Sequence, residues 1–405
     1  MKKSYIAMTI ALMCAVFSCS KSDNDGPVEI ELATKGQEFA DATLDITAKL
    51  FESVEDEGNV AFSPFSVQMA MSMIAEGTDG QTRDEILDAM GISSGEIQEL
   101  RSYSCELMKK LPRIGKGLVD LKIVNGVFLD GQYNFEKDFV NVLKGEYLAE
   151  AKTFSSLADL ERQAKDWVEK STDGSIKDFN VNPNNVSIIT TVLNAMTFKG
   201  KWKNPFKKNL TSPTMFTSRD GSRERISIMK QQKWLTACNN RRVGFKCVYL
   251  PYKGDNYRME VYLPDSQDKM KDMLQYLKDN NYNLTEEIDS YNVDLWLPKF
   301  ETESYLELDG VLKSMGIKKA FAPDADFSNL TKDINNVYLV SSLQKTILSV
   351  DEEGTVAKTV TSVSAGGRVA IVHELEFHAD HPYIYLIREI STGVCLFAGQ
   401  FVEKQ

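Results

Sequence analysis

Apolar residues recur through the first half of the chain at the spacing of helices. Residues 39–54 and 159–171 each carry an apolar stripe with a period of three to four residues, which predicts two amphipathic helices. Ser63-Pro64 predicts the start of another helix, because proline at the first helical position loses no hydrogen bond. Gly77 predicts the end of that helix.

In the second half, the apolar positions follow the alternation and the short uncharged runs of β-strands. The run over 186–198 has few charges and predicts a strand that is buried on both faces. Early helices and later strands, without a linker or repeat between them, favour a single α+β domain over residues 36–405. Further strands are predicted at 247–263 (two strands around a turn), 293–297, 337–350, 383–387 and 394–401.

The first 35 residues follow a different pattern. Two lysines precede the apolar run 6–17, which is short for a membrane span and is typical of an export signal. The segment resembles a bacterial lipoprotein signal, in which residues 1–18 are removed and Cys19 carries the lipid, and residues 19–35 then form a polar tether. We expect an outer-membrane lipoprotein on the cell surface. The alternative is an ordinary cleaved signal, with a periplasmic or secreted product.

Composition excludes several classes of function. The formal net charge of -11 argues against a nucleic-acid partner, which normally faces a basic surface. The only histidines are His373, His378 and His381, so any metal site or histidine base must draw on these three. His373 and His378 miss the H-E-x-x-H spacing, and neither G-x-S-x-G nor a P-loop occurs. We expect no enzyme, metal or cofactor, and contact with a membrane only through the lipid.

Four cysteines remain beyond the export segment. Asn239–Arg242 predicts a hairpin turn, which pairs Cys238 with Val243 and places Cys247 opposite Trp234. That register separates the two cysteines by more than the Cβ distance of about 4.5 Å that a disulfide needs. We therefore expect buried thiols rather than a disulfide or a zinc site, and the sequence leaves their redox state open. The four are Cys105, Cys238, Cys247 and Cys395.

The composition changes sharply after Asp351–Gly354. Residues 355–370 are small, β-branched and almost uncharged. If this segment forms a strand, one face carries Thr355, Ala357, Thr359, Thr361, Val363 and Ala365. The opposite face carries Lys358, which is the only charge before Arg368, so the first face can be buried without burying a charge. The segment is compatible with a loop and with a strand, and on composition alone a flexible loop or an edge strand is the simpler interpretation.

Six motifs follow one another along the chain. They are 59–66 (NVAFSPFS), 166–176 (from Asp166-Trp167-Val168-Glu169 to Ile176), 193–202 (LNAMTFKGKW), 250–255 (LPYKGD), 350–355 (VDEEGT) and 377–399 (from FHADHP to FAG). In this order and at this spacing they resemble the serpin family of protease inhibitors. The resemblance runs from about residue 36 to the end of the chain.

The resemblance implies a serpin fold, which is α+β, with a large central sheet, two further sheets, eight or nine helices and an exposed reactive-centre loop at about 354–376. In serpins, a protease cleaves this loop and forms an acyl-enzyme, and the cut loop then inserts into the central sheet and traps the protease. About fifteen residues at roughly 3.3 Å each span on the order of 50 Å, enough to carry the protease across a domain. The implied partner is a target protease, held by a monomer in a covalent 1:1 complex.

The resemblance also assigns functional residues. Fourteen residues onward from Gly354 and fourteen back from Pro382 both reach Arg368, so the reactive bond is expected at Arg368–Val369. Arginine there suits a trypsin-like serine protease, with an Arg-specific cysteine protease as the competing target. The remaining assignments are the hinge (Glu352, Glu353, Gly354, Thr355, Val356, Ala357 and Thr359), the shutter beneath the central sheet (Ser63, Ser66, Asn194 and Gln344), and Trp202 in the breach, where the loop first enters the sheet.

Two interpretations stay open beside this one. Arg368 is one of several loop bonds that proteases could cut, because exposed loops admit many proteases. The chain could also be a non-inhibitory serpin that acts as a carrier or chaperone. Mixing with trypsin separates the two functions, because an inhibitor forms a complex that survives SDS whereas a carrier is only clipped.

Overall fold

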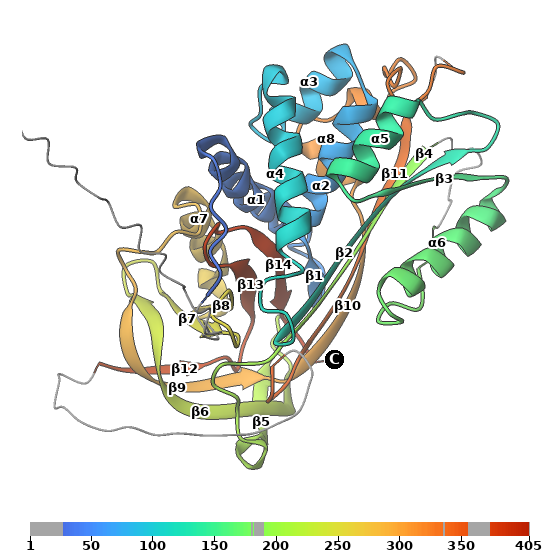
Figure 1. The fold of residues 1–405 in the computed structure, drawn as a ribbon. Helices are drawn as coiled ribbons and strands as arrows, with labels where there is room; N and C mark the ends of the chain where they lie inside the picture. The colour runs from blue at the N-terminus through green and yellow to red at the C-terminus, as the bar shows by residue number, and fades with distance from the viewer. Residues whose placement is uncertain (1–26, 180, 182–189, 335–336, 355–372, 405) are drawn as a thin grey trace, which may run out of the picture.

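A mixed five-stranded sheet in the order β10-β11-β4-β2-β3 forms the centre of the fold (Figure 1). The computed structural model describes residues 27–179, 181, 190–334, 337–354 and 373–404. Within the sheet, β4 and β11 are parallel neighbours, whereas β2 is antiparallel to β4 and β10 is antiparallel to β11. The five strands are β2 (Val119–Asp130), β3 (Glu150–Phe154), β4 (Thr190–Gly200), β10 (Phe300–Glu307) and β11 (Leu339–Val350).

Helices cover both faces of this central sheet (Figure 1). Leu193 of β4 packs in one apolar cluster with Trp167 of α6, whereas Val192 and Met196 belong to the main core on the face covered by α2. Burial on both faces confirms the strand expected within 186–198, over residues 190–198. The described residues form eight α-helices: α1 (Thr34–Ser53), α2 (Pro64–Gly77), α3 (Gly80–Asp88), α4 (Ile97–Lys110), α5 (Lys137–Glu146), α6 (Leu157–Ser171), α7 (Met270–Asp279) and α8 (Asp309–Ser314).

The remaining strands are connected into one sheet through the long strand β6. Two separate sheets were expected here, but β6 pairs with β5 and β9 along most of its length and with β7 at its end. The strand β6 therefore belongs to both of the expected sheets and joins them into one. These strands are β1 (Val60–Phe62), β5 (Ser212–Thr217), β6 (Arg223–Asn240), β7 (Phe245–Pro251), β8 (Tyr257–Pro264), β9 (Asp289–Pro298), β12 (Glu374–His378), β13 (Tyr383–Glu389) and β14 (Cys395–Phe401).

Local signals place most helices as the sequence predicts. Ser63 caps α2, because its hydroxyl oxygen accepts the backbone N–H of Ser66 at 3.2 Å, and the helix ends at Gly77. The apolar stripes predicted over 39–54 and 159–171 correspond to α1 and α6. Within the described ranges, no helix combines the length and the apolar character needed to cross a membrane.

The β6–β7 hairpin differs from its sequence prediction. The turn covers residues 241–244, so that Asn240 pairs with Phe245 and Cys238 lies directly opposite Cys247. Gly244 takes a φ of +92°, a conformation that favours glycine, and this residue rather than the asparagine pair closes the turn. The predicted pairing of Cys238 with Val243 is therefore wrong. A second correction is that Cys105 is only half-buried, whereas the other three described thiols are buried.

Candidate reactive-loop insertion site

The parallel pair β4–β11 is hydrogen-bonded along only part of its length. Its register ends at Ile347 opposite Thr197, whereas β11 pairs with β10 as far as Val350 and β4 pairs with β2 as far as Gly200. The last three residues of each strand thus have a partner on the outer side and none across the β4–β11 boundary. We name this end of the boundary, residues 348–350 and 198–200, the open seam. Its unpaired backbone groups can accept a further strand.

At the open seam, β11 leaves the sheet through a closed turn, Asp351–Gly354. The backbone N–H of Asp351 donates to the Gly354 carbonyl at 2.8 Å, and the Asp351 carboxylate accepts the backbone N–H of Glu353 at 2.9 Å. Gly354 forms an antiparallel bridge with Lys201, just beyond β4, at a φ of +137°. A Cβ atom on Gly354 would lie 2.1 Å from the carbonyl oxygen of Gly200. Only glycine permits this approach between the two backbones.

The segment that follows β4 binds this turn. The backbone N–H of Trp202 donates to the Glu353 carbonyl at 2.9 Å. The backbone N–H of Phe206 donates to the Glu352 carbonyl at 2.8 Å. Trp202 is buried, and its ring stacks on Tyr252 with 4.5 Å between centroids. The indole Nε1 of Trp202 donates to the Asp351 carbonyl at 2.9 Å. Trp202 thus contacts the hinge turn through Asp351 and Glu353, whereas Glu352 is bound by Phe206.

Ion pairs hold the two hinge glutamates outside the sheet. Lys299 Nζ lies 3.0 Å from the nearly buried Glu352 carboxylate, and the Thr211 hydroxyl donates to it at 2.8 Å. Burial raises the pKa of Glu352, but hydrogen bonds from its own backbone, Lys299 and Thr211 outweigh burial and hold the pKa below its ordinary value. Lys208 pairs with Glu353 at 2.8 Å. Sequence reasoning missed these partners, because Lys299 and Thr211 lie 53 and 141 residues from Glu352.

The four predicted shutter residues do not all bond to one another. The Gln344 side chain accepts the Ser63 backbone N–H at 2.7 Å and donates to the Ser63 carbonyl at 2.9 Å, and Ser63 in turn caps Ser66. Asn194 lies beside Gln344 in the β4–β11 register, but its amide donates to the Asn125 side chain of β2 at 2.6 Å. Asn125, Asn194 and Gln344 thus form a polar row across three strands, in the part of the boundary where β4 and β11 are paired. Sequence reasoning missed Asn125, whose one signal is a polar residue within a buried strand.

The strand that follows the loop is anchored separately. β12 pairs in parallel with β9, and His381 lies three residues after the end of β12. The two ring nitrogens of His381 lie 2.9 Å from the Asp380 carboxylate and 2.7 Å from the Pro264 carbonyl. Because both neighbours are acceptors, the contacts favour the imidazolium form of the ring, in which both nitrogens donate. Burial lowers the pKa of His381 and the nearby Lys246 charge opposes protonation, but the two hydrogen bonds outweigh both and raise the pKa.

Several predicted functional residues lie outside the described residues. They are the reactive bond Arg368–Val369, the hinge residues Thr355, Val356, Ala357 and Thr359, and the lipidation site Cys19. The roles assigned to them rest on the sequence. Of the predicted hinge, the structure describes Glu352, Glu353 and Gly354.

Comparison with known proteins identifies the family. Residues 40–404 match the family described as serpin (serine protease inhibitor). Serpin-ZXA of Oryza sativa subsp. japonica is 32% identical over 362 residues, covering 85% of this chain and 90% of that protein. The native state of tengpin, a thermophilic serpin, superposes with a TM-score of 0.81 at 27% identity, covering 93% of this chain and 96% of tengpin. Human thyroxine-binding globulin, solved with thyroxine, superposes with a TM-score of 0.80 at 24% identity, covering 91% of this chain and 98% of that one.

These matches confirm the expected α+β fold around a large central sheet. The family match covers residues 40–404, and the described residues outside it are 27–39. The chain therefore belongs to the serpin family, a family of protease inhibitors rather than enzymes.

Proposed function

We propose that this serpin is a suicide-substrate inhibitor of an arginine-selective protease. The target, a trypsin-like serine protease, cleaves Arg368–Val369 and stays bound to Arg368 as an acyl-enzyme while the cut loop inserts between β4 and β11. An Arg-specific cysteine protease is the competing target, and it would form the corresponding thioester. The complex is covalent and 1:1, with the inhibitor as a monomer.

The open seam beside Gly354 is the observation that carries this proposal. β4 and β11 pair directly, so the uncut chain has a parallel pair at the centre of its sheet. A strand added between them would run antiparallel to both and would replace one parallel contact with two antiparallel ones, which are slightly more stable per residue. Gly354 lies where such a strand would begin. The added ladder supplies the driving force for insertion.

Two anchors explain why insertion waits for cleavage. At the start of the loop, the hinge turn is held by Trp202 and by the ion pairs of Glu352 and Glu353. At its end, β12 is paired with β9 and followed by the His381 contacts. A loop that is fixed at both ends cannot enter the seam along its whole length. Cleavage frees the part that begins at Gly354.

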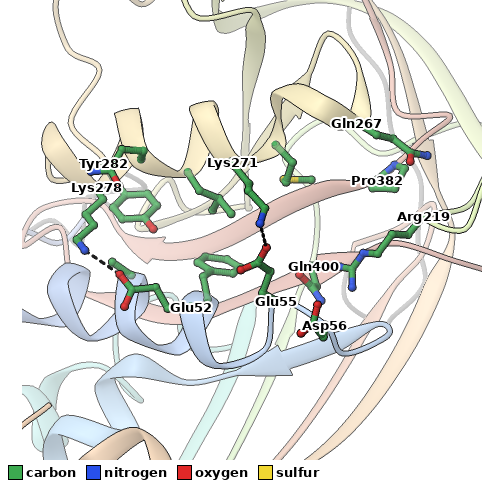
Figure 2. Close-up of a pocket in the computed structure, with 15 residues that line it drawn as sticks. Glu52, Glu55, Asp56, Arg219, Gln267, Lys271, Lys278, Tyr282, Pro382 and Gln400 are labelled. Carbon is green, nitrogen blue, oxygen red and sulfur yellow. Dashed lines mark hydrogen bonds and ion pairs between the residues drawn. The ribbon is translucent and has the colours of Figure 1, made fainter. Parts of the chain in front are cut away.

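A groove between α1 and α7 favours the second candidate function, that of a carrier (Figure 2). Its volume of about 360 Å³ lies within the range of small-molecule sites, and Phe51 forms part of its apolar lining. Figure 2 shows two ion pairs across the groove. Glu52 of α1 lies 2.7 Å from Lys278 of α7, and Glu55, just after α1, lies 2.5 Å from Lys271 of α7. Thyroxine-binding globulin, which shares the fold, was solved with thyroxine, so this fold can hold a small ligand. The hinge contacts favour the inhibitor over the carrier.

Incubation with trypsin tests the proposal. We expect a complex that survives SDS, a released fragment whose first residue is Val369, and a cleaved protein that resists heat better than the intact one. The matched control is Arg368→Gln, which should resist trypsin at this bond and form no complex. Clipping without a complex or a gain in heat resistance would favour the carrier and refute the inhibitor. A fragment that begins at another residue would show that the reactive bond is not Arg368–Val369.

The export prediction is part of the same proposal. A lipidated Cys19 with the tether 19–35 would hold the inhibitor at the outer face of the outer membrane, within reach of extracellular proteases. The polar composition of residues 20–27 supports this arrangement, because such segments act as flexible spacers. The later part of the expected tether belongs to the domain instead, because Ile30 is buried in the core, its backbone N–H donates to the Ser391 hydroxyl at 2.9 Å, and α1 begins at Thr34. A periplasmic or secreted inhibitor is the alternative.

A further inference from the structure

Cys238 and Cys247 face each other directly in the β6–β7 hairpin. Residues that oppose each other in an antiparallel pair have Cα atoms about 4.5–5.5 Å apart. A disulfide usually spans Cα distances of about 4.4–6.8 Å. The hairpin register therefore satisfies the main geometric requirement for a disulfide without a shift of either strand.

The two thiols are in contact inside the protein. Both residues are fully buried, at 0% exposure, and their side chains are hydrogen-bonded to each other. Burial raises the pKa of the Cys247 thiol, and the hydrogen bond with Cys238 raises it further. On the other side of β7, Cys247 lies opposite Tyr262 of β8, so the pair is enclosed within the sheet. A bond formed there is shielded from reductants once the hairpin has packed.

The other two described cysteines lack this arrangement. Cys395 of β14 lies opposite Arg388 of β13 and is buried. Cys105 is half-buried on α4, and Lys109 Nζ lies 2.7 Å from its sulfur. Neither has a cysteine opposite it in the described structure, so both serve as internal controls for unspecific oxidation.

We propose that Cys238 and Cys247 form a structural disulfide when the chain folds in the presence of a disulfide oxidant. The thiolate of one cysteine attacks the oxidant's S–S bond, which gives a mixed disulfide and releases one thiol. The second thiolate attacks the mixed disulfide at the cysteine sulfur, forms the S–S bond and releases the oxidant's second thiol. Two protons and two electrons pass from the cysteine pair to the oxidant. The proposed export would bring the chain into a compartment that supplies such oxidants.

Peptide mapping tests this directly. The full chain is refolded in a buffer of oxidised and reduced glutathione, alkylated with iodoacetamide in denaturant and digested with trypsin. Cleavage after Lys233, Arg241, Lys246 and Lys253 separates the two cysteines into peptides 234–241 and 247–253. We expect a disulfide-linked species of these two peptides that disappears when the protein is reduced before alkylation. The peptides with Cys105 and Cys395 should be alkylated without prior reduction.

Two variants serve as matched controls. Cys105→Ser should retain the linked species and Cys238→Ser should lose it. The wild-type map decides the proposal even where a variant fails to fold. Recovery of Cys238 and Cys247 as alkylated thiols without reduction overturns the proposal, as does a link from either to another cysteine. Inhibition of trypsin is not used as a readout, so this test and that of the proposed function fail independently.

Discussion

Replacing Gly354 with alanine tests the close contact at the hinge. The new Cβ would lie 2.1 Å from the Gly200 carbonyl oxygen and 2.7 Å from both the Lys201 Cα and the Trp202 backbone nitrogen. All three are backbone atoms, so no side-chain rotation relieves the clash. The φ of +137° is also unfavourable for any residue with a Cβ. The turn must therefore move away from the end of β4.

Two contributions determine how much the Gly354→Ala substitution lowers the free energy of unfolding. A backbone held in a sparsely populated region costs about 1–3 kcal/mol, and forcing an atom into a packed site costs a similar amount, so about 3 kcal/mol is a reasonable total. An unfolding entropy of about 2.1 cal/mol/K per residue, applied to the 365 residues over 40–404 that match the family, converts this to a fall in Tm of about 4 °C.

Thermal unfolding of the intact and the trypsin-cleaved protein measures the effect. If cleavage lets the hinge extend into the sheet, as proposed, alanine is tolerated there, and we expect only the intact Gly354→Ala protein to lose stability. Gly310→Ala in α8 is the matched control, because no atom lies within 4 Å of its new Cβ. An unchanged Tm of the intact variant would refute the close contact. An equal loss in both forms would refute the movement of the hinge on cleavage.

Three further predictions follow from the loop, its anchor and the export signal. Thr355→Arg should turn the inhibitor into a substrate, because an inward guanidinium resists burial, whereas Lys358→Arg on the opposite face should still form the SDS-stable complex with trypsin. The folded state raises the pKa of His381, so protonation of this ring stabilises the fold. The stabilisation is complete at a pH below the unfolded pKa of about 6.5 and is lost as the pH rises through the folded pKa. Between pH 6 and pH 9 the Tm of the wild type should therefore fall more than that of His381→Gln, and parallel profiles would contradict the imidazolium. Cys19→Ala should abolish fatty-acid labelling and membrane association, and retention of both would exclude lipidation at this residue.

Sequence patterns were sufficient wherever a segment determines its own structure. Ser63, Pro64 and Gly77 delimit α2, because capping contacts are formed within one or two turns. The uncharged apolar run predicted β4, because a strand covered on both faces needs apolar side chains in both directions.

Predictions failed in two situations: where the position of a turn was misjudged, and where distant segments compete for the same partners. The Cys238–Cys247 register was missed, because a hairpin register depends on which residue takes the positive φ, and Gly244 takes it in place of the asparagines. Asn194 was expected in one cluster with Gln344 and Ser63, but strand order places β2 beside β4 and offers Asn125 instead.

The sequence by itself determined the composition of the loop, the arginine at 368 and the order of motifs that led to the family. Only the tertiary structure decided that the β4–β11 pairing stops short of Val350 and Gly200, and that Gly354 packs against the strand end there. The physical reason is that pairing between strands depends on backbone groups that every residue carries. Side chains along one segment cannot specify which distant backbone those groups will meet.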